Sequence, residues 1–162
     1  MAARYPDLTD VIGSLPDTDG MLNLSPAEAC ELLSRGAVLV DIREAYETNY
    51  RVFDVEEVLY LPWTHFSTYC DVLPRNRALI VADAAGIYVN EAARTLRDDG
   101  YLNIARLVGG MIDWIRDGLP VRKDDAFELS GQCACKMKTR HGGNPLIDKR
   151  SDDANGSLGP ES

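Results

Sequence analysis

The sequence predicts an α/β domain with a central, mainly parallel sheet. Three short apolar runs are bounded by charged residues or by proline, which is typical of strands buried on both faces, and a fourth short strand precedes a pair of glycines. Between and after these runs, apolar residues recur at helical spacing, and strands that alternate with helices favour a parallel sheet. The four predicted strands are residues 37–40, 57–61, 78–82 and 104–108.

The length and composition of the chain fit one domain with extensions. The chain has 162 residues, of which 45% are hydrophobic and 27% are charged. A core of about 100 to 120 residues can fold without disulfides. No apolar run approaches the roughly 18 residues needed to cross a bilayer, and residues 1–10 do not have the pattern of a secretory signal. We therefore expect a cytoplasmic protein without a membrane partner.

The first part of the chain predicts an extension and then a helix. Residues 1–21 are punctuated by Pro, Asp and Gly, and Leu8 belongs to a short apolar pattern that can pack as one helical turn against the main body. Ser25 and Glu28 form a capping box with a proline at the first helical position, so a helix begins here. Gly36 ends this helix.

Two further helices are predicted in the second half of the domain. Apolar residues at helical spacing predict a helix over residues 88–99. The last predicted strand leads through Gly109 and Gly110 into a helix at residues 111–117, because two glycines allow a tight turn. Trp114 is expected to be a core residue of that helix.

Charge is distributed unevenly along the chain. The sequence contains 17 Lys and Arg against 26 Asp and Glu, a net charge of −9, and residues 1–121 hold the whole acidic excess. Such a surface repels phosphate backbones, so nucleic acid is excluded as a partner and a basic protein or segment is favoured. The alternative is that the charge serves solubility alone. Residues 122–162 form a neutral C-terminal extension whose composition after about residue 150 is typical of a flexible or disordered tail.

Four motifs occur in order along the domain. They are Leu39 to Glu44, Leu59 to Pro62, Leu79 to Asp83, and Gly109-Gly110 through Trp114 to Val121. Their order and spacing over residues 22–121 resemble those of the rhodanese (sulfurtransferase) domain family. The resemblance implies a three-layer α/β fold, in which helices cover both faces of a mainly parallel five-stranded sheet.

Charged and polar residues follow two of the predicted strands. Asp41 and Arg43 lie at the end of a buried strand, and a buried charge requires a partner. We therefore expect a structural ion pair or loop hydrogen bonds here, with a catalytic role as the alternative. His65 follows the second strand, where we expect a partly buried structural histidine, with a position lining the cleft as the alternative.

The resemblance also identifies a candidate active-site loop. In active members of the family, this loop begins with a cysteine that carries sulfur as a persulfide, and its converging amides and basic residues stabilise the charge and attract an anionic donor. The corresponding residues here are Asp83, Ala84, Ala85, Gly86, Ile87 and Tyr88. A carboxylate cannot form a persulfide, and the loop contains no Lys or Arg. We expect thiosulfate sulfurtransferase-type activity of the usual loop to be absent.

Asp83 therefore needs another role. If the loop keeps the shape found in the family, the amides hold the Asp83 carboxylate as a built-in anion, which is a structural role. A general base or an aspartyl nucleophile is the alternative, but either would need a substrate-binding cation that the loop does not supply.

The remaining thiols differ in their surroundings. Cys30 and Cys70 have apolar neighbours and are expected to be packing residues. Cys133 and Cys135 lie in a basic stretch that favours thiolate. Three interpretations remain open: a sulfur-carrying or redox arm in which Cys133 resolves a Cys135 persulfide, a metal site completed by His141, or an ordinary tail with incidental thiols.

The sequence as a whole favours a rhodanese-like domain that lacks the usual loop nucleophile. We expect it to act as a binding or regulatory module in sulfur or redox metabolism, with a basic protein or a sulfur-transfer protein as its partner. The alternative is a sulfurtransferase or sulfur carrier that uses Cys135 with Cys133. No cofactor and no metal site is assigned.

Overall fold

Five strands form one parallel sheet in the order β1-β6-β5-β2-β4. The computed structural model describes Leu8 and residues 20–123 of the chain. The strands are β1 (Leu22–Leu24), β2 (Val38–Asp41), β4 (Val58–Tyr60), β5 (Leu79–Ala82) and β6 (Ile104–Leu107). Every neighbouring pair in this sheet runs parallel, which confirms the predicted fold class.

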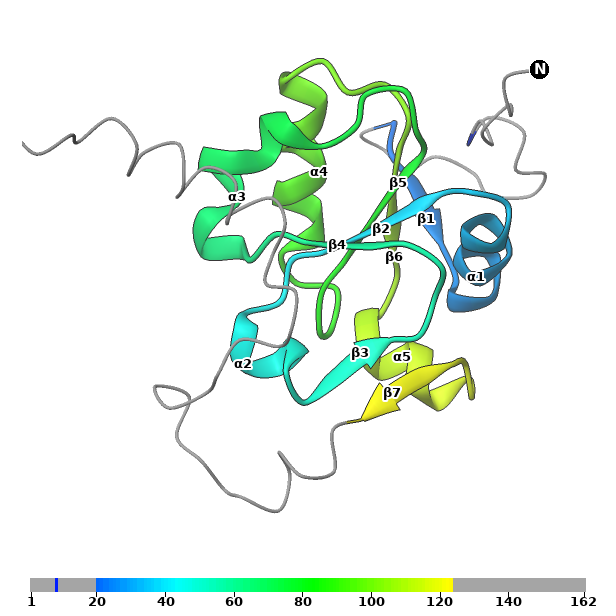
Figure 1. Cartoon of the computed structure of the whole chain (residues 1–162). Coiled ribbons are helices and arrows are strands. Elements are labelled where there is room, and N and C mark those ends of the chain that lie inside the picture. The colour runs from blue at the N-terminus through cyan, green and yellow to red at the C-terminus, as the bar shows by residue number, and fades with distance from the viewer. Residues whose placement is uncertain (1–7, 9–19, 124–162) are drawn as a thin grey trace, which may run out of the picture.

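Helices cover both faces of the sheet, so the fold has three layers (Figure 1). One face packs against α3 (Trp63–Tyr69) and α4 (Val89–Asp98), and the other packs against α1 (Pro26–Ser34) and α5 (Gly110–Arg116). Side chains alternate between the faces along each strand. In β2, Val40 therefore lies in the core beneath α4, whereas Leu39 lies in the core beneath α1. Two short helices, α2 (Ala45–Thr48) and η2 (Cys70–Val72), follow β2 and α3, respectively.

Local sequence signals determine where the helices begin and which side they bury. The predicted capping box is present at α1, because the Ser25 hydroxyl accepts from the Glu28 N–H at 3.3 Å and the Glu28 carboxylate accepts from the Ser25 N–H at 2.8 Å. Trp114 is fully buried, as predicted, and its indole N–H donates to the carbonyl of Pro120 at 2.9 Å. The edge of its ring system meets the ring of Phe53, with centroids 5.2 Å apart.

A second sheet of two antiparallel strands was not predicted from the sequence. It pairs β3 (Arg51–Phe53) with β7 (Val121–Lys123), so a strand extends to Lys123, past the predicted domain end at residue 121. Leu8, from the predicted N-terminal extension, is buried in the core, and its N–H donates to the Asn103 side chain at 3.0 Å. None of the helices within residues 20–123 is long and apolar enough to cross a membrane.

Candidate functional site

The candidate loop, residues 83–88, follows β5 near the centre of the parallel sheet and leads into α4. In open parallel sheets of this kind, ligands bind outside the carboxyl ends of the strands. The segments that follow β2, β4 and β6 start at this same edge of the sheet. The loop therefore lies where the fold places binding sites.

The Asp83 carboxylate occupies the centre of this loop. One oxygen, Oδ1, accepts from the backbone N–H groups of Ala85 (3.1 Å) and Gly86, and the other, Oδ2, accepts from the N–H of Tyr88 at 2.7 Å. Gly86 has a φ of +83°, a conformation that glycine adopts without strain. Asp83 is only 4% exposed. Three amides of the loop thus converge on a charge that belongs to the chain itself.

A second glycine brings the loop against the start of α5. The Asp83 carbonyl accepts from the N–H of Met111 at 2.9 Å, and the Ala84 carbonyl accepts from the N–H of Ile112 at 3.1 Å. Gly110 lies between these contacts with a φ of +58°, and a Cβ added to it would collide with the backbone of Asp83 and Ala84. Gly110 is therefore required for the packing of the start of α5 against the loop, in addition to the tight turn predicted from the sequence.

The predicted ion pair between Asp41 and Arg43 is present and buried. Arg43 Nη2 lies 2.7 Å from Asp41 Oδ2, and Arg43 Nε lies 3.0 Å from Asp41 Oδ1. Nη2 also donates to the carbonyl of Arg51 at 2.9 Å, and the guanidinium lies over the ring of Phe53. These contacts tie β2 to β3, so the pair acts structurally and its cation is already occupied.

Aromatic residues lie beside the loop. The rings of Trp63 and Tyr88 stack with centroids 5.5 Å apart. Phe66 is buried and Trp63 and Tyr69 pack against the same core, so the inward positions of α3 are filled by aromatic residues. His65 is exposed, and the expectation of a partly buried histidine was therefore wrong. Its ring meets that of Tyr69, the last residue of α3, with centroids 6.2 Å apart.

Several apolar side chains near the loop are exposed, and the sequence did not predict which ones. Seven large hydrophobic side chains are exposed within the described part of the chain, and five of them come from the loop or from the segment after β6. These five are Ile87, Tyr88, Val108, Ile112 and Ile115. From the sequence alone these residues cannot be told apart from core residues, because the exposure of an apolar side chain depends on which neighbours the fold places around it.

The two described cysteines lie away from this arrangement. Cys30 is half-buried on α1 and Cys70 is buried in η2. The Cys70 thiol donates to a carboxylate oxygen of Asp99 at 3.1 Å, and burial together with this carboxylate raises the pKa of Cys70 to about 11. Cys133 and Cys135 lie outside the described residues.

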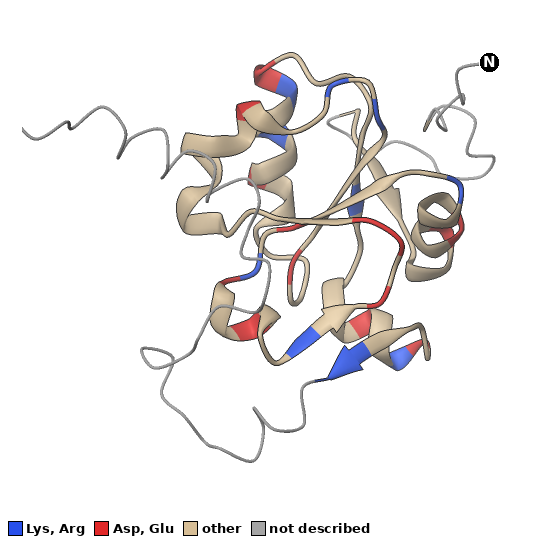
Figure 2. Ribbon diagram, in the orientation of Figure 1, with Lys and Arg blue, Asp and Glu red and all other residues tan. Residues whose placement is uncertain are grey.

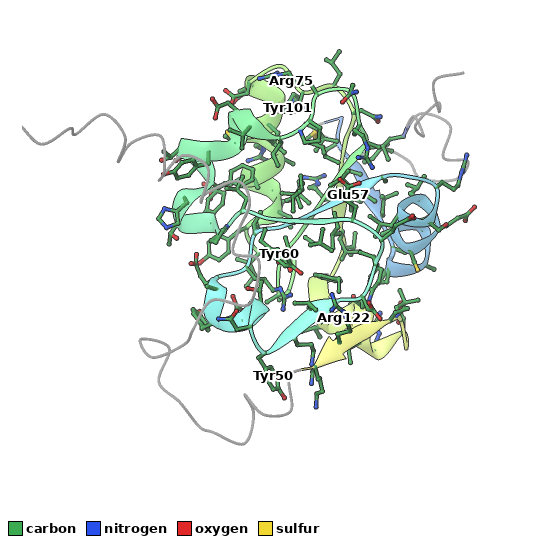
Figure 3. All side chains as sticks on the ribbon, viewed as in Figure 1. Tyr50, Glu57, Tyr60, Arg75, Tyr101 and Arg122 are labelled. Atoms are coloured by element: carbon green, nitrogen blue, oxygen red, sulfur yellow. The ribbon has the colours of Figure 1, made fainter. Side chains whose placement is uncertain are left out.

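The ring of Tyr101 anchors the region around Cys70. Its hydroxyl donates to the carbonyls of Cys70 (2.9 Å) and Leu73 (2.7 Å), and the Arg75 guanidinium lies over its ring. Figure 3 shows Arg75 and Tyr101 at one end of the molecule, with Arg122 of β7 toward the opposite end. The protonated thiol of Cys70 is therefore part of a structural cluster.

Taken together, the parallel strand order, the helices on both faces and the amide loop after β5 define a rhodanese-like α/β domain. A sulfurtransferase of Allochromatium vinosum is 30% identical over 84 residues, which cover 52% of this chain and 77% of that protein. The chain belongs to the rhodanese-like sulfurtransferase family. Thiosulfate sulfurtransferase GlpE of Haemophilus influenzae is 28% identical over 102 residues, which cover 60% of this chain and 91% of the relative. No protein-family model matches the chain.

Solved structures agree with this assignment. The polysulfide-sulfur transferase homodimer of Wolinella succinogenes aligns with a TM-score of 0.57 and 26% identity, over 64% of this chain and 80% of that chain. A rhodanese-related protein of Thermoplasma volcanium has the same fold, with a TM-score of 0.53 and 23% identity over 63% of this chain and 98% of that one. The fold implied by the sequence motifs is therefore confirmed.

Proposed function

We propose that this rhodanese-like domain acts as a binding or regulatory module in sulfur or redox metabolism and does not transfer sulfur at its own loop. The observation that carries the proposal is the occupation of the loop amides by the Asp83 carboxylate. The family of the chain supports the link to sulfur metabolism.

The chemistry of sulfur transfer explains why Asp83 argues against activity. A thiolate attacks the outer sulfur of thiosulfate, the sulfur–sulfur bond of the donor breaks, and sulfite leaves with the bonding electrons. A carboxylate cannot take the sulfur as a persulfide. The amides that would stabilise a sulfur anion already bind Asp83, and the nearby guanidinium of Arg43 is paired with Asp41. The nucleophile, the anion site and the donor-binding cation are thus all missing from the loop.

The charge of the domain supports a particular kind of partner. Residues 1–121 hold the entire acidic excess of the chain. The loop between β5 and α4 contains no Lys or Arg, as Figure 2 shows. A protein with a basic surface, such as a sulfur-transfer protein, is electrostatically favoured at this face over a nucleic acid.

A second candidate function uses the thiols beyond the described residues. Lys136, Lys138 and Arg140 follow Cys135 in the sequence, and nearby cations favour the thiolate. Cys135 would take the outer sulfur of thiosulfate as a persulfide and release sulfite. The Cys133 thiolate would then attack Cys135 Sγ, forming a disulfide and releasing hydrosulfide, so that atoms and charge balance.

Mass spectrometry separates the two candidates. The reduced full-length protein is incubated with thiosulfate, and separately with a persulfide donor, and peptides are analysed for added sulfur. The proposed module predicts neither added sulfur on any of the four cysteines nor a Cys133–Cys135 disulfide that forms only with the donor. Sulfur on Cys135, or that disulfide, would establish the second candidate if it is lost in Cys135→Ser, and sulfur on Cys30 or Cys70 would refute both.

A further inference from the structure

Four exposed apolar side chains, Ile87, Tyr88, Val108 and Ile112, form what we term the loop patch. They are 69%, 47%, 47% and 60% exposed, respectively. They come from two segments that are joined by backbone hydrogen bonds. The N–H of Met111 donates to the carbonyl of Asp83, and the N–H of Ile112 donates to the carbonyl of Ala84. Exposed apolar residues gathered at one site are characteristic of binding surfaces.

The charges around the loop patch are predominantly acidic. Residues 42–47, 61–65, 83–91 and 108–113 follow the carboxyl ends of the sheet strands, and Arg43 is the one Lys or Arg they contain. Arg43 is buried against Asp41 and contributes no free positive charge. The same segments contain five acidic residues, namely Glu44, Glu47, Asp83, Glu91 and Asp113. Asp83 is buried among the loop amides and Asp113 is paired with Arg116 at 3.0 Å, so Glu44, Glu47 and Glu91 supply the negative charge that is left for a ligand. A ligand of this surface therefore needs both apolar and cationic groups.

We propose that residues 133–141 of this same chain dock on the loop patch. In this segment Lys136, Lys138 and Arg140 alternate with other residues, and Met137 stands between the two lysines. The flexible thioether side chain of methionine adapts to irregular apolar surfaces. The flanking cations complement the acidic surroundings of the loop patch.

The length of the connection permits this contact within one molecule. Cys135 is twelve residues beyond Lys123, the last residue of β7. An extended chain of that length spans about 40 Å, whereas a domain of about 100 residues has a radius of gyration of about 13 Å. A tethered segment also has an effective concentration in the millimolar range, so even a weak contact is populated.

Docking would bring Cys133 and Cys135 to the edge of the sheet at which active family members carry their nucleophile. It would also cover the surface on which a basic partner acts, so that the segment and the partner compete. The inference concerns contact alone and does not depend on whether either thiol carries sulfur. Its test is therefore separate from the sulfur experiment above.

Methyl NMR of the full-length protein tests the contact. Isoleucine methyl groups are labelled, which reports Ile87 and Ile112 on the loop patch and Ile42 and Ile80 in the core. The variant Lys136→Glu/Lys138→Glu/Arg140→Glu is expected to shift the patch methyls and leave the core methyls unchanged. The matched control Lys149→Glu/Arg150→Glu reverses two charges outside the segment and is expected to leave all four resonances unchanged.

A second pair of variants tests the surface itself, with the Met137 methyl as the reporter. Ile112→Glu is expected to move the Met137 resonance to its position in a synthetic peptide of residues 131–143. Leu102→Glu, at an apolar residue that is 95% exposed in the turn before β6, should leave it unchanged. Patch methyls that do not respond to the triple variant would overturn the inference, and so would shifts that depend on protein concentration, because these indicate contact between copies.

Discussion

The carboxylate of Asp83 is the acceptor for three loop amides, and replacing it with Ala tests its structural role. Each hydrogen bond to a charged acceptor contributes about 1.5 to 3 kcal/mol. The simple sum, about 4.5 to 9 kcal/mol, is an upper bound, because Ala85 and Tyr88 are exposed and water can replace part of the lost bonding. We therefore expect Asp83→Ala to lower the free energy of unfolding by about 3 kcal/mol.

Urea denaturation measures this loss directly. With a slope of about 2 kcal/mol per M, the midpoint should fall by about 1.5 M. The control is Asp98→Ala, which removes an exposed carboxylate near the end of α4 and should change stability by less than about 0.5 kcal/mol. If Asp83→Ala behaves like this control, the carboxylate does not stabilise the loop and the reasoning fails.

Three further predictions concern the surrounding structure. Gly110→Ala should destabilise the protein by at least about 2 kcal/mol more than Gly118→Ala, because both have positive φ but only Gly110 has backbone in the way. Arg43→Met should cost about 3 to 5 kcal/mol, since it leaves Asp41 charged, buried and without its guanidinium. Cys70 should make stability decline between about pH 9 and about pH 11, because the unfolded thiol, with a pKa of 9.0, ionises before the folded one.

Each of these three predictions has an outcome that would contradict it. Equal losses in Gly110→Ala and Gly118→Ala would show that the loops can move apart, and an Arg43→Met protein as stable as the parent would show that Asp41 finds other partners. The thiol contribution is read as the difference between the parent and Cys70→Ala. Identical pH profiles for these two proteins between pH 8 and 11 would contradict the raised pKa.

The sequence predicted the mainly apolar strands, including the three-residue β4, and missed the short strands whose pattern polar residues interrupt. The runs that became β2 and β5 are continuously apolar apart from the terminal Asp41, and β6 is interrupted only by Arg106; burial on both faces favours such a composition. Strands β1, β3 and β7 have three residues each, and polar residues such as Asn23 and Arg51 interrupt their pattern. They form because tertiary partners supply their hydrogen bonds, and a single sequence does not carry that information.

Some features of the candidate site could likewise be predicted from the sequence, whereas others required the structure. Its location after β5 follows from the strand pattern, and the expectation that Asp83 stands in the position of the nucleophile comes from the resemblance to the rhodanese family. The contact of Gly110 with the backbone of Asp83 joins residues that are far apart in the chain, so it required the structure. The exposure of Ile87 and Ile112 also depends on which neighbours the fold places around them.

The two outer strands of the five-stranded sheet, β1 and β4, have three residues each. A long open strand attracts other chains, which extend the sheet through main-chain hydrogen bonds. Strands of three residues have few unpaired backbone N–H and C=O groups with which another chain could pair. The partner proposed above would therefore be recognised through side chains, and a few surface substitutions in a related chain would be enough to change that partner while leaving the sheet intact.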